Sequence, residues 1–113
     1  MRYVPDSSDI VWISLDPSQG REQAGRRPFL VLTPRRYNEK TALAVGCPIT
    51  SRAKGYPFEV TLTTESTSGV VLADHVRSID WRGRDVSYIE RASRRTDDAT
   101  RTLVATLLRI RTR

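Results

Sequence analysis

The sequence predicts a mainly β fold, a small barrel or sandwich with a single C-terminal helix. Short runs rich in β-branched and aromatic residues recur along the chain, and segments rich in Gly, Pro, Asp or Ser separate them. The only long segment with helical periodicity lies at the C-terminal end. A chain of 113 residues can close one hydrophobic core but is too short for a second lobe, so residues 1–113 should form a single domain.

Six runs are the candidate strands. Turn chemistry separates them, since DPSQG at 16–20 and KGYP at 54–57 each combine Pro with a Gly that can adopt positive φ. Trp12, Phe29 and Phe58 lie within apolar runs and are expected in the core. The runs are IVWISL after Asp9, PFLVLT from Pro28, ALAVGCPI from Ala42, FEVTL from Phe58, GVVLADHVRSI from Gly69 and VSYIERA from Val86.

Two segments favour helix. Residues 35–40, RRYNEK, can form one short helical turn, whereas the segment from Thr96 has the pattern of a long helix that Asp97 or Asp98 can cap. The charge-rich stretches at 81–85 and 94–98 are predicted to be solvated turns. The long helix should dock on the barrel through one apolar face, made of Leu103, Val104, Leu107, Leu108 and Ile110.

The charge balance favours an anionic partner. Nineteen Lys and Arg against thirteen Asp and Glu give a net charge of +6 and a pI near 10.2, which attracts nucleic acid or an acidic protein segment. The single Cys47 argues against a disulfide framework and favours a reducing compartment, by default the cytoplasm. No signal-peptide pattern is found, and no apolar run approaches the roughly 18 residues that span a bilayer.

Polar residues crowd the segment between the first two candidate strands. Glu22, Gln23, Arg26 and Arg27 all lie there, while the chain has only one histidine and one cysteine. Chemistry at this position would therefore depend on carboxylate, guanidinium and hydroxyl groups. Neither a metal site nor a cofactor is expected.

Four segments carry a family resemblance through their order, their spacing and their loop residues. They are DIVWISLDPSQGREQAGRRPFLVLTP, YNEKT, CPITSRAKGYPFEV and GVVLADHVRSIDW, and they resemble the MazF/PemK (Kid) family of toxin endoribonucleases from about Tyr3 to Trp81. The most specific part is GxEQxGxRP followed by PxTS. The resemblance implies an SH3-like barrel of the MazF/PemK/CcdB type that forms a homodimer. It also implies metal-independent cleavage of single-stranded RNA, which inhibits translation, and silencing by a MazE-like antitoxin with an acidic, flexible tail.

Metal-free RNA cleavage needs three groups, because the ribose 2′-OH must be deprotonated, the phosphorane stabilised and the 5′-oxygen protonated. Arg27 suits the second role, since its planar fork can hold two phosphate oxygens, and Thr50 can donate a hydroxyl hydrogen bond. The resemblance makes Arg27 and Thr50 the essential pair. Glu22 is the candidate acceptor of the 2′-OH proton, or it orients Arg27. For an isolated Glu and Arg, an ordinary surface ion pair would be the favoured explanation, but inside this motif it is not.

His75 beside Asp74 suggests a second acid–base arrangement. We expect His75 to contact an RNA base or solvent instead, because neighbours in an alternating strand face opposite sides. The family does not rely on a histidine at this position. Asp74 matches an acidic residue implicated in catalysis in the PemK branch, but Leu72 stands where that branch has an arginine. The sequence therefore favours the MazF type.

Further residues near the loops that would rim the site are predicted to bind RNA, with Tyr56 or Trp81 stacking on unpaired bases. Two alternatives remain, a non-catalytic SH3-like RNA- or protein-binding module and a gyrase-inhibiting toxin of the same fold. The joint presence of the three catalytic candidates favours an enzyme over a module. The predicted binding residues are Gln23, Arg26, Arg52, Lys54, Tyr56, Asp74, His75 and Arg77.

Overall fold

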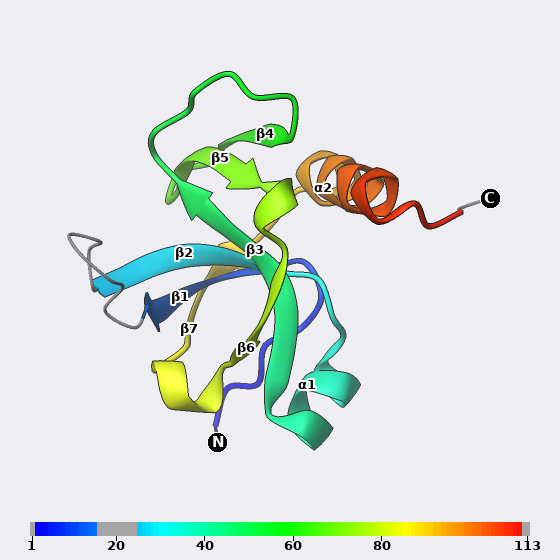
Figure 1. Cartoon of the computed structure of the whole chain (residues 1–113). Helices are drawn as coiled ribbons and strands as arrows, with labels where there is room; N and C mark the ends of the chain where they lie inside the picture. The colour runs from blue at the N-terminus through cyan, green and yellow to red at the C-terminus, as the bar shows by residue number, and fades with distance from the viewer. Residues whose placement is uncertain (1, 16–24, 112–113) are drawn as a thin grey trace, which may run out of the picture.

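The computed structural model describes residues 2–15 and 25–111, so Glu22, Gln23 and the predicted DPSQG loop lie outside the described residues. The described part is mainly β, as predicted, and its antiparallel strands curl into a half-barrel (Figure 1). The strand order is β4-β5-β3-β2-β1-β7, and β6 pairs with β3. The strands are β1 (Asp9–Leu15), β2 (Gly25–Val31), β3 (Leu43–Thr50), β4 (Glu59–Thr63), β5 (Ser68–Leu72), β6 (Arg77–Asp80) and β7 (Ser87–Arg91).

Helical segments join or cover these strands. The helix α1 (Arg35–Thr41) confirms the short helical turn predicted at RRYNEK, and α2 (Arg94–Leu108) is the C-terminal helix. Two 3-10 turns, η1 (Ala73–His75) and η2 (Arg82–Arg84), flank β6. The helix α2 packs against η1 and β4, whereas α1 and the N-terminal segment lie at the opposite end of the sheet (Figure 1). No helix in residues 2–15 and 25–111 is both long enough and apolar enough to cross a membrane.

Strand β3 connects the two halves of the curled sheet. Its first residues pair with β6, its middle pairs with β2, and Ile49 and Thr50 pair with β5. Gly46 stands where β2 and β6 both meet β3, and a Cβ there would lie 2.1 Å from the Leu30 carbonyl oxygen and 2.5 Å from the Phe29 ring. Only glycine therefore permits this close crossing.

Two hydrophobic clusters cover the two faces of β1 and β2. Ile10 pairs with Leu30 in one cluster and Val11 pairs with Phe29 in the other, as the period of two in a strand requires. The first cluster lies under α2 and includes Cys47, which is fully buried as predicted. The second cluster contains Trp81, which is 2 % exposed.

Asn38 in α1 is fully buried and satisfied by hydrogen bonds. Its Nδ2 donates to the carbonyl oxygens of Pro5 and Thr33 at 2.8 and 2.9 Å, and its Oδ1 accepts from Thr33 Oγ1 at 2.6 Å. Its backbone oxygen accepts from Trp81 Nε1 at 2.9 Å. The asparagine of YNEKT thus joins the N-terminal segment, the end of β2 and the end of β6, which is a structural role.

Helix α2 begins earlier than the sequence predicts. Its N-cap is Ser93, whose Oγ accepts from the Thr96 amide at 3.1 Å, so the prediction that Asp97 or Asp98 caps the helix was wrong. Asp97 lies in the first turn and accepts from Arg101 Nε at 2.8 Å. Residues 94–98 are therefore helical and not a solvated turn.

The apolar face of α2 packs on the sheet only as far as Val104. Leu103 and Val104 contact the first cluster, whereas Leu107, Leu108 and Ile110 are 39, 54 and 56 % exposed. The prediction that all five residues dock on the barrel was therefore wrong for three of them. The end of α2 projects beyond the sheet, so no strand lies beneath it (Figure 1).

Candidate active site

Strands β2 and β3 separate next to the predicted catalytic residues. Their last paired residues are Phe29 and Pro48, after which β3 turns to pair with β5. Continuing the same register by two residues places Arg27 opposite Thr50. Although β2 and β3 no longer pair there, both residues lie beside the point where the two strands separate.

The first of two hollows beside the end of β3 contains Arg27, and we call it the arginine notch. Its volume is about 310 Å³, and Arg27 is half-buried in its wall. Trp12 also lines the notch and is 38 % exposed, so its assignment to the core was wrong. It pairs with Pro28 on the face of β1 that turns toward the notch. The lining residues are Trp12, Gly25, Arg26, Arg27, Pro28, Ile49, Ser51 and Ser68.

The second hollow contains Thr50, and we call it the threonine groove. Its volume is about 240 Å³, and six of the residues predicted from the sequence line it. Ile49 and Ser51 line the arginine notch while Thr50 lines the groove, so the end of β3 forms the wall between the two. The lining residues are Thr50, Arg52, Lys54, Tyr56, Glu59, Leu72, Asp74 and His75.

Two contacts hold Thr50 in place. Its Oγ1 accepts from the Arg52 amide at 3.2 Å, and its hydroxyl proton has no acceptor among the described residues. Gly69 of β5 has a φ of 135°, and a Cβ there would lie 2.2 Å from the Thr50 carbonyl oxygen. The close approach of β5 to the Thr50 carbonyl group therefore needs glycine. The Thr50 hydroxyl can donate its proton to a phosphate oxygen.

Glu59, at the start of β4, organises the loop that covers the groove. Its carboxylate accepts from the Lys54 amide at 3.0 Å and from the Gly55 amide at 2.9 Å. Gly55 has a φ of 83°, and Tyr56 beside it is 60 % exposed. Sequence reasoning missed Glu59, although an acidic residue just after a Gly-Tyr-Pro turn is a signal for a carboxylate that caps loop amides.

Asp74 and His75 both line the threonine groove, with His75 Nε2 3.9 Å from Asp74 Oδ1. The expectation of an alternating strand from Gly69 was wrong here, because β5 ends at Leu72 and η1 follows. The 3-10 turn brings both side chains to one hollow, and both are exposed.

Cys47 lies behind this turn, and its Sγ donates to the Ala73 carbonyl oxygen at 3.9 Å. Burial, together with the negative charge of Asp74, raises the pKa of the Cys47 thiol to about 12. The thiol therefore stays protonated at neutral pH. A buried, protonated thiol is not a nucleophile, so Cys47 is a packing residue.

Three other predicted residues have different surroundings. Arg26 Nη1 donates to the Asp85 carbonyl and Oδ2 at 2.7 and 2.9 Å, and its Nη2 donates to Ser87 Oγ at 2.6 Å. Arg77 is exposed on β6 and lines neither hollow. Trp81 is buried, so the prediction that it stacks on RNA was wrong, and Tyr56 is the exposed candidate. Residues 2–15 and 25–111 contain no group of three or more His, Cys, Asp or Glu placed to hold a metal ion.

Residues 6–108 match the family described as the PemK-like, MazF-like toxin of type II toxin–antitoxin systems. The chain belongs to this family. The toxin is 53 % identical over 83 residues to the endoribonuclease toxin MazF of Escherichia coli K12, covering 74 % of this chain and 75 % of that protein. It is 38 % identical over 100 residues to the endoribonuclease PemK of Escherichia coli, covering 80 % and 75 %.

Among solved structures, the toxin is similar to the MazE–MazF structure from Deinococcus radiodurans. The TM-score is 0.90 and the identity 50 %, over 97 % of this toxin and 100 % of that chain. The predicted fold and family are thereby confirmed. The higher identity to MazF than to PemK agrees with the MazF type that Leu72 indicates.

Proposed function

We propose that this toxin cuts single-stranded RNA at short sequences through attack of a ribose 2′-OH on the adjacent phosphate, without a metal ion. The chain is an endoribonuclease of a type II toxin–antitoxin pair, since it belongs to that family and is 53 % identical to an endoribonuclease over three quarters of both proteins. The observation that supports the proposed chemistry is that Arg27 and Thr50 line hollows on the two sides of the end of β3, beside the point where β2 and β3 separate.

In this mechanism the 2′-oxygen forms a bond to phosphorus and the bond from phosphorus to the 5′-oxygen breaks. The products are a 2′,3′-cyclic phosphate and a 5′-hydroxyl. The 2′-OH proton passes to a base, for which Glu22 remains our candidate, and a general acid protonates the leaving 5′-oxygen. Glu22 either takes the 2′-OH proton or orients Arg27, and variants of Glu22 can separate these two roles.

Arg27 and Thr50 stabilise the charge that develops on the phosphorane. A guanidinium can donate two parallel hydrogen bonds to the non-bridging oxygens and stays charged at any working pH. The hydroxyl of Thr50, already oriented by the Arg52 amide, donates a further hydrogen bond. Such donors work because they are held in position before the reaction begins.

The bases on either side of the cut bind in the two hollows. Tyr56 and Trp12 are exposed aromatic residues, one at the threonine groove and one at the arginine notch, and each can stack on an unpaired base. The other residues that are predicted to bind RNA also contact the strand. Arg26 contributes if a phosphate displaces Asp85 from their exposed ion pair, because such an ion pair is weak. These contacts come from Gln23, Arg26, Arg52, Lys54, Asp74, His75 and Arg77.

The decisive test uses a long RNA with and without excess EDTA, followed by mapping of the new ends. We expect unchanged cleavage in EDTA, a 2′,3′-cyclic phosphate and a 5′-hydroxyl. Replacing the nucleotide at the cut by its deoxyribose form should abolish cleavage, because the nucleophile is gone. Cleavage of that deoxy substrate at an undiminished rate would refute 2′-OH attack.

A type II toxin has a cognate antitoxin, and relatives from Deinococcus radiodurans and a mycobacterial species have structures together with theirs. We propose that an acidic, flexible tail of the antitoxin covers the arginine notch and the threonine groove. We also propose a homodimer, because the exposed Leu107, Leu108 and Ile110 offer an apolar surface to a second copy. The substrate of the toxin would be cytoplasmic mRNA. No observation favours gyrase as the target.

A further inference from the structure

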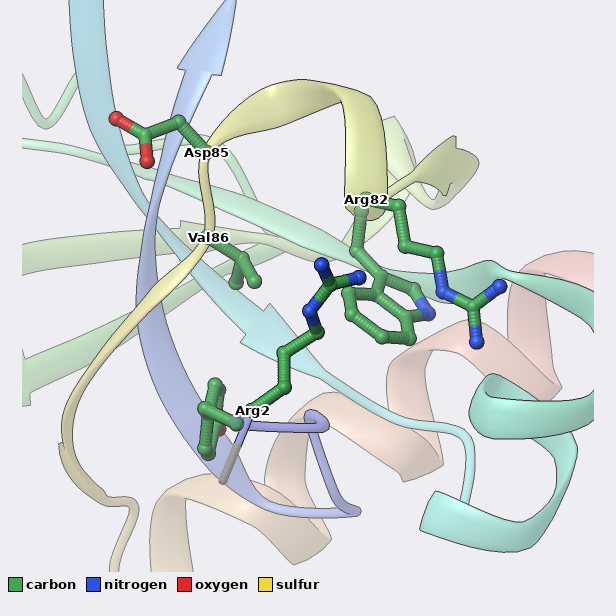
Figure 2. A pocket seen from close by; sticks show the side chains of 6 residues that line it. Arg2, Arg82, Asp85 and Val86 are labelled. Atoms are coloured by element: carbon green, nitrogen blue, oxygen red, sulfur yellow. The ribbon is translucent and has the colours of Figure 1, made fainter.

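A third hollow lies away from the proposed active site, and we call it the distal pocket. The N-terminal segment, η2 and the start of β7 enclose it, with a volume of about 220 Å³. Figure 2 shows the Arg2 guanidinium directed into the pocket from the N-terminal segment, whereas the Arg82 guanidinium turns toward α1 and the Asp85 carboxylate points away from both. The lining residues are Arg2, Tyr3, Trp81, Arg82, Asp85 and Val86.

The distal pocket offers hydrogen-bond donors and positive charge. Arg82 lies with Cζ 5.0 Å from the Trp81 ring centroid, and its Nη2 donates to the Glu39 carbonyl oxygen at 3.2 Å. Arg2 is exposed, and no described residue gives it a hydrogen bond or an ion pair. Trp81 is 2 % exposed, so it supports Arg82 and offers no stacking surface. This chemistry suits a phosphate group better than a base.

A line of arginines connects the distal pocket to the arginine notch. Asp85 lines the pocket and also accepts from Arg26, which lines the notch. Arg84 Nη1 donates to the carbonyl oxygen of Ser14, the residue that pairs with Arg26 across β1 and β2. Arg26, Arg84, Arg82 and Arg2 thus form what we call the basic track, four positive charges, with the Asp85 carboxylate bound to Arg26.

We propose that the basic track binds the backbone of RNA that extends beyond the cut site, with one phosphate held by Arg2 and a neighbouring one by Arg82. This inference rests on the proposed function, because it gives the RNA strand that leaves the arginine notch a second contact on the toxin. The four side chains that define the track all carry guanidinium groups. That composition fits phosphates better than a protein tail, which also needs apolar pockets. The contact should therefore add affinity without sequence preference.

The test compares two uncleavable RNA analogues with deoxyribose at the mapped cut site, one covering only the cut sequence and one extended at both ends. The variant is Arg2→Gln with Arg82→Gln, in which glutamine keeps part of the side chain over Trp81. We expect the extended RNA to bind on the order of tenfold more weakly, with the short RNA unchanged. The slope of log affinity against log salt should fall by about 1.4 for the extended RNA, since each single-strand phosphate contact contributes about 0.7.

The matched control is Arg94→Gln with Arg95→Gln, which removes the same charge from exposed positions at the start of α2. It should leave binding of both RNAs near the wild-type value. The single variant Arg2→Gln removes a side chain without described partners, so it remains folded even if the double variant is unstable. It should show about half the change in slope.

Three results would overturn the inference. They are equal binding of the extended RNA by variant and wild type, equal losses in variant and control, or a loss confined to an acidic peptide, which would assign the track to the antitoxin. Wild-type protein that binds the short analogue and cuts the corresponding all-ribose RNA while any of these holds would leave the proposed function standing. Wild-type protein that neither binds nor cuts RNA would remove the proposed function itself.

Discussion

Thr50 shows how neighbouring backbone positions a reactive side chain. The Arg52 amide occupies one lone pair of its hydroxyl, and Gly69 lets β5 approach its carbonyl group. The hydroxyl proton then points to no described acceptor and remains available to a ligand. A threonine in a longer loop would lose this orientation, because nothing would restrict its rotamer.

Loss of either member of the proposed catalytic pair should be far more damaging than loss of the histidine. Arg27→Ala and Thr50→Ala should each lower the cleavage rate on the order of 100- to 1000-fold, the usual effect of removing one preorganised charge-stabilising donor. His75→Ala should lose less, because His75 is exposed at the rim of the threonine groove. Single-turnover cleavage, with circular dichroism to check folding, measures this. An equally inactive His75→Ala would move the acid–base role to the histidine.

Glu59 should act through the loop it holds. Glu59→Gln replaces a charged acceptor of the Lys54 and Gly55 amides by a neutral one, so Tyr56 and Lys54 should lose their fixed positions. We expect KM for RNA to rise several-fold with a smaller change in kcat, measured by steady-state cleavage. The control is Glu65→Gln, an exposed carboxylate in the turn between β4 and β5. A purely structural role would instead lower the thermal midpoint and leave KM unchanged.

At the scale of the elements, β3 decides the site, because it leaves β2 after Pro48 and joins β5. Gly46 allows the sheet to curl there, and the separation of the strands opens the arginine notch. Helix α2 covers the first hydrophobic cluster. Its N-cap is Ser93, so the helix begins before Asp97 and Asp98, the caps that the sequence suggests.

The position of the α2 cap can be tested directly. Ser93→Ala should lower the free energy of unfolding by about 1 kcal/mol, because the Thr96 amide loses its acceptor. Asp98→Ala should change it by less than about 0.5 kcal/mol, the usual limit for an exposed substitution. Urea unfolding of both variants gives the two values. A larger loss for Asp98→Ala than for Ser93→Ala would contradict the observed helix start.

At the scale of the whole molecule, arginines surround both hollows and continue along the basic track, which accounts for much of the net charge of +6. Phosphates and carboxylates are attracted by the same field. RNA and an acidic antitoxin tail should therefore compete for the toxin.

Competition is measured by titrating an uncleavable RNA analogue against the proposed acidic segment of the antitoxin, with the mass of the toxin assembly checked in parallel. We expect mutual displacement, weakening with salt as exposed ion pairs are screened. Leu107→Ser with Leu108→Ser provides a control that alters the proposed dimer surface but neither hollow. If both ligands bound together at saturation with unchanged affinities, the shared site would be excluded.

The sequence by itself determined five of the strands, the short helix α1, the loop at 54–57 and six residues of the threonine groove, whereas η1 divides the strand expected from Gly69 into β5 and β6. Each of these depends on local signals, such as a period of two in apolar residues or a Gly and Pro in a turn. The family motif added the pairing of Arg27 with Thr50, which are too far apart in the chain for local pattern to connect.

The tertiary structure alone decided which residues of similar local pattern are covered. Trp12 lies in β1 and Trp81 directly follows β6, yet Trp12 lines the arginine notch, whereas Trp81 is buried and donates to the Asn38 carbonyl oxygen. Leu103 and Leu107 share one face of α2, but only Leu103 has sheet beneath it. Arg26 is bound by Asp85, which is 59 positions later. Burial and ion pairing depend on segments that approach from far along the chain, and local periodicity carries no information about which segments those are.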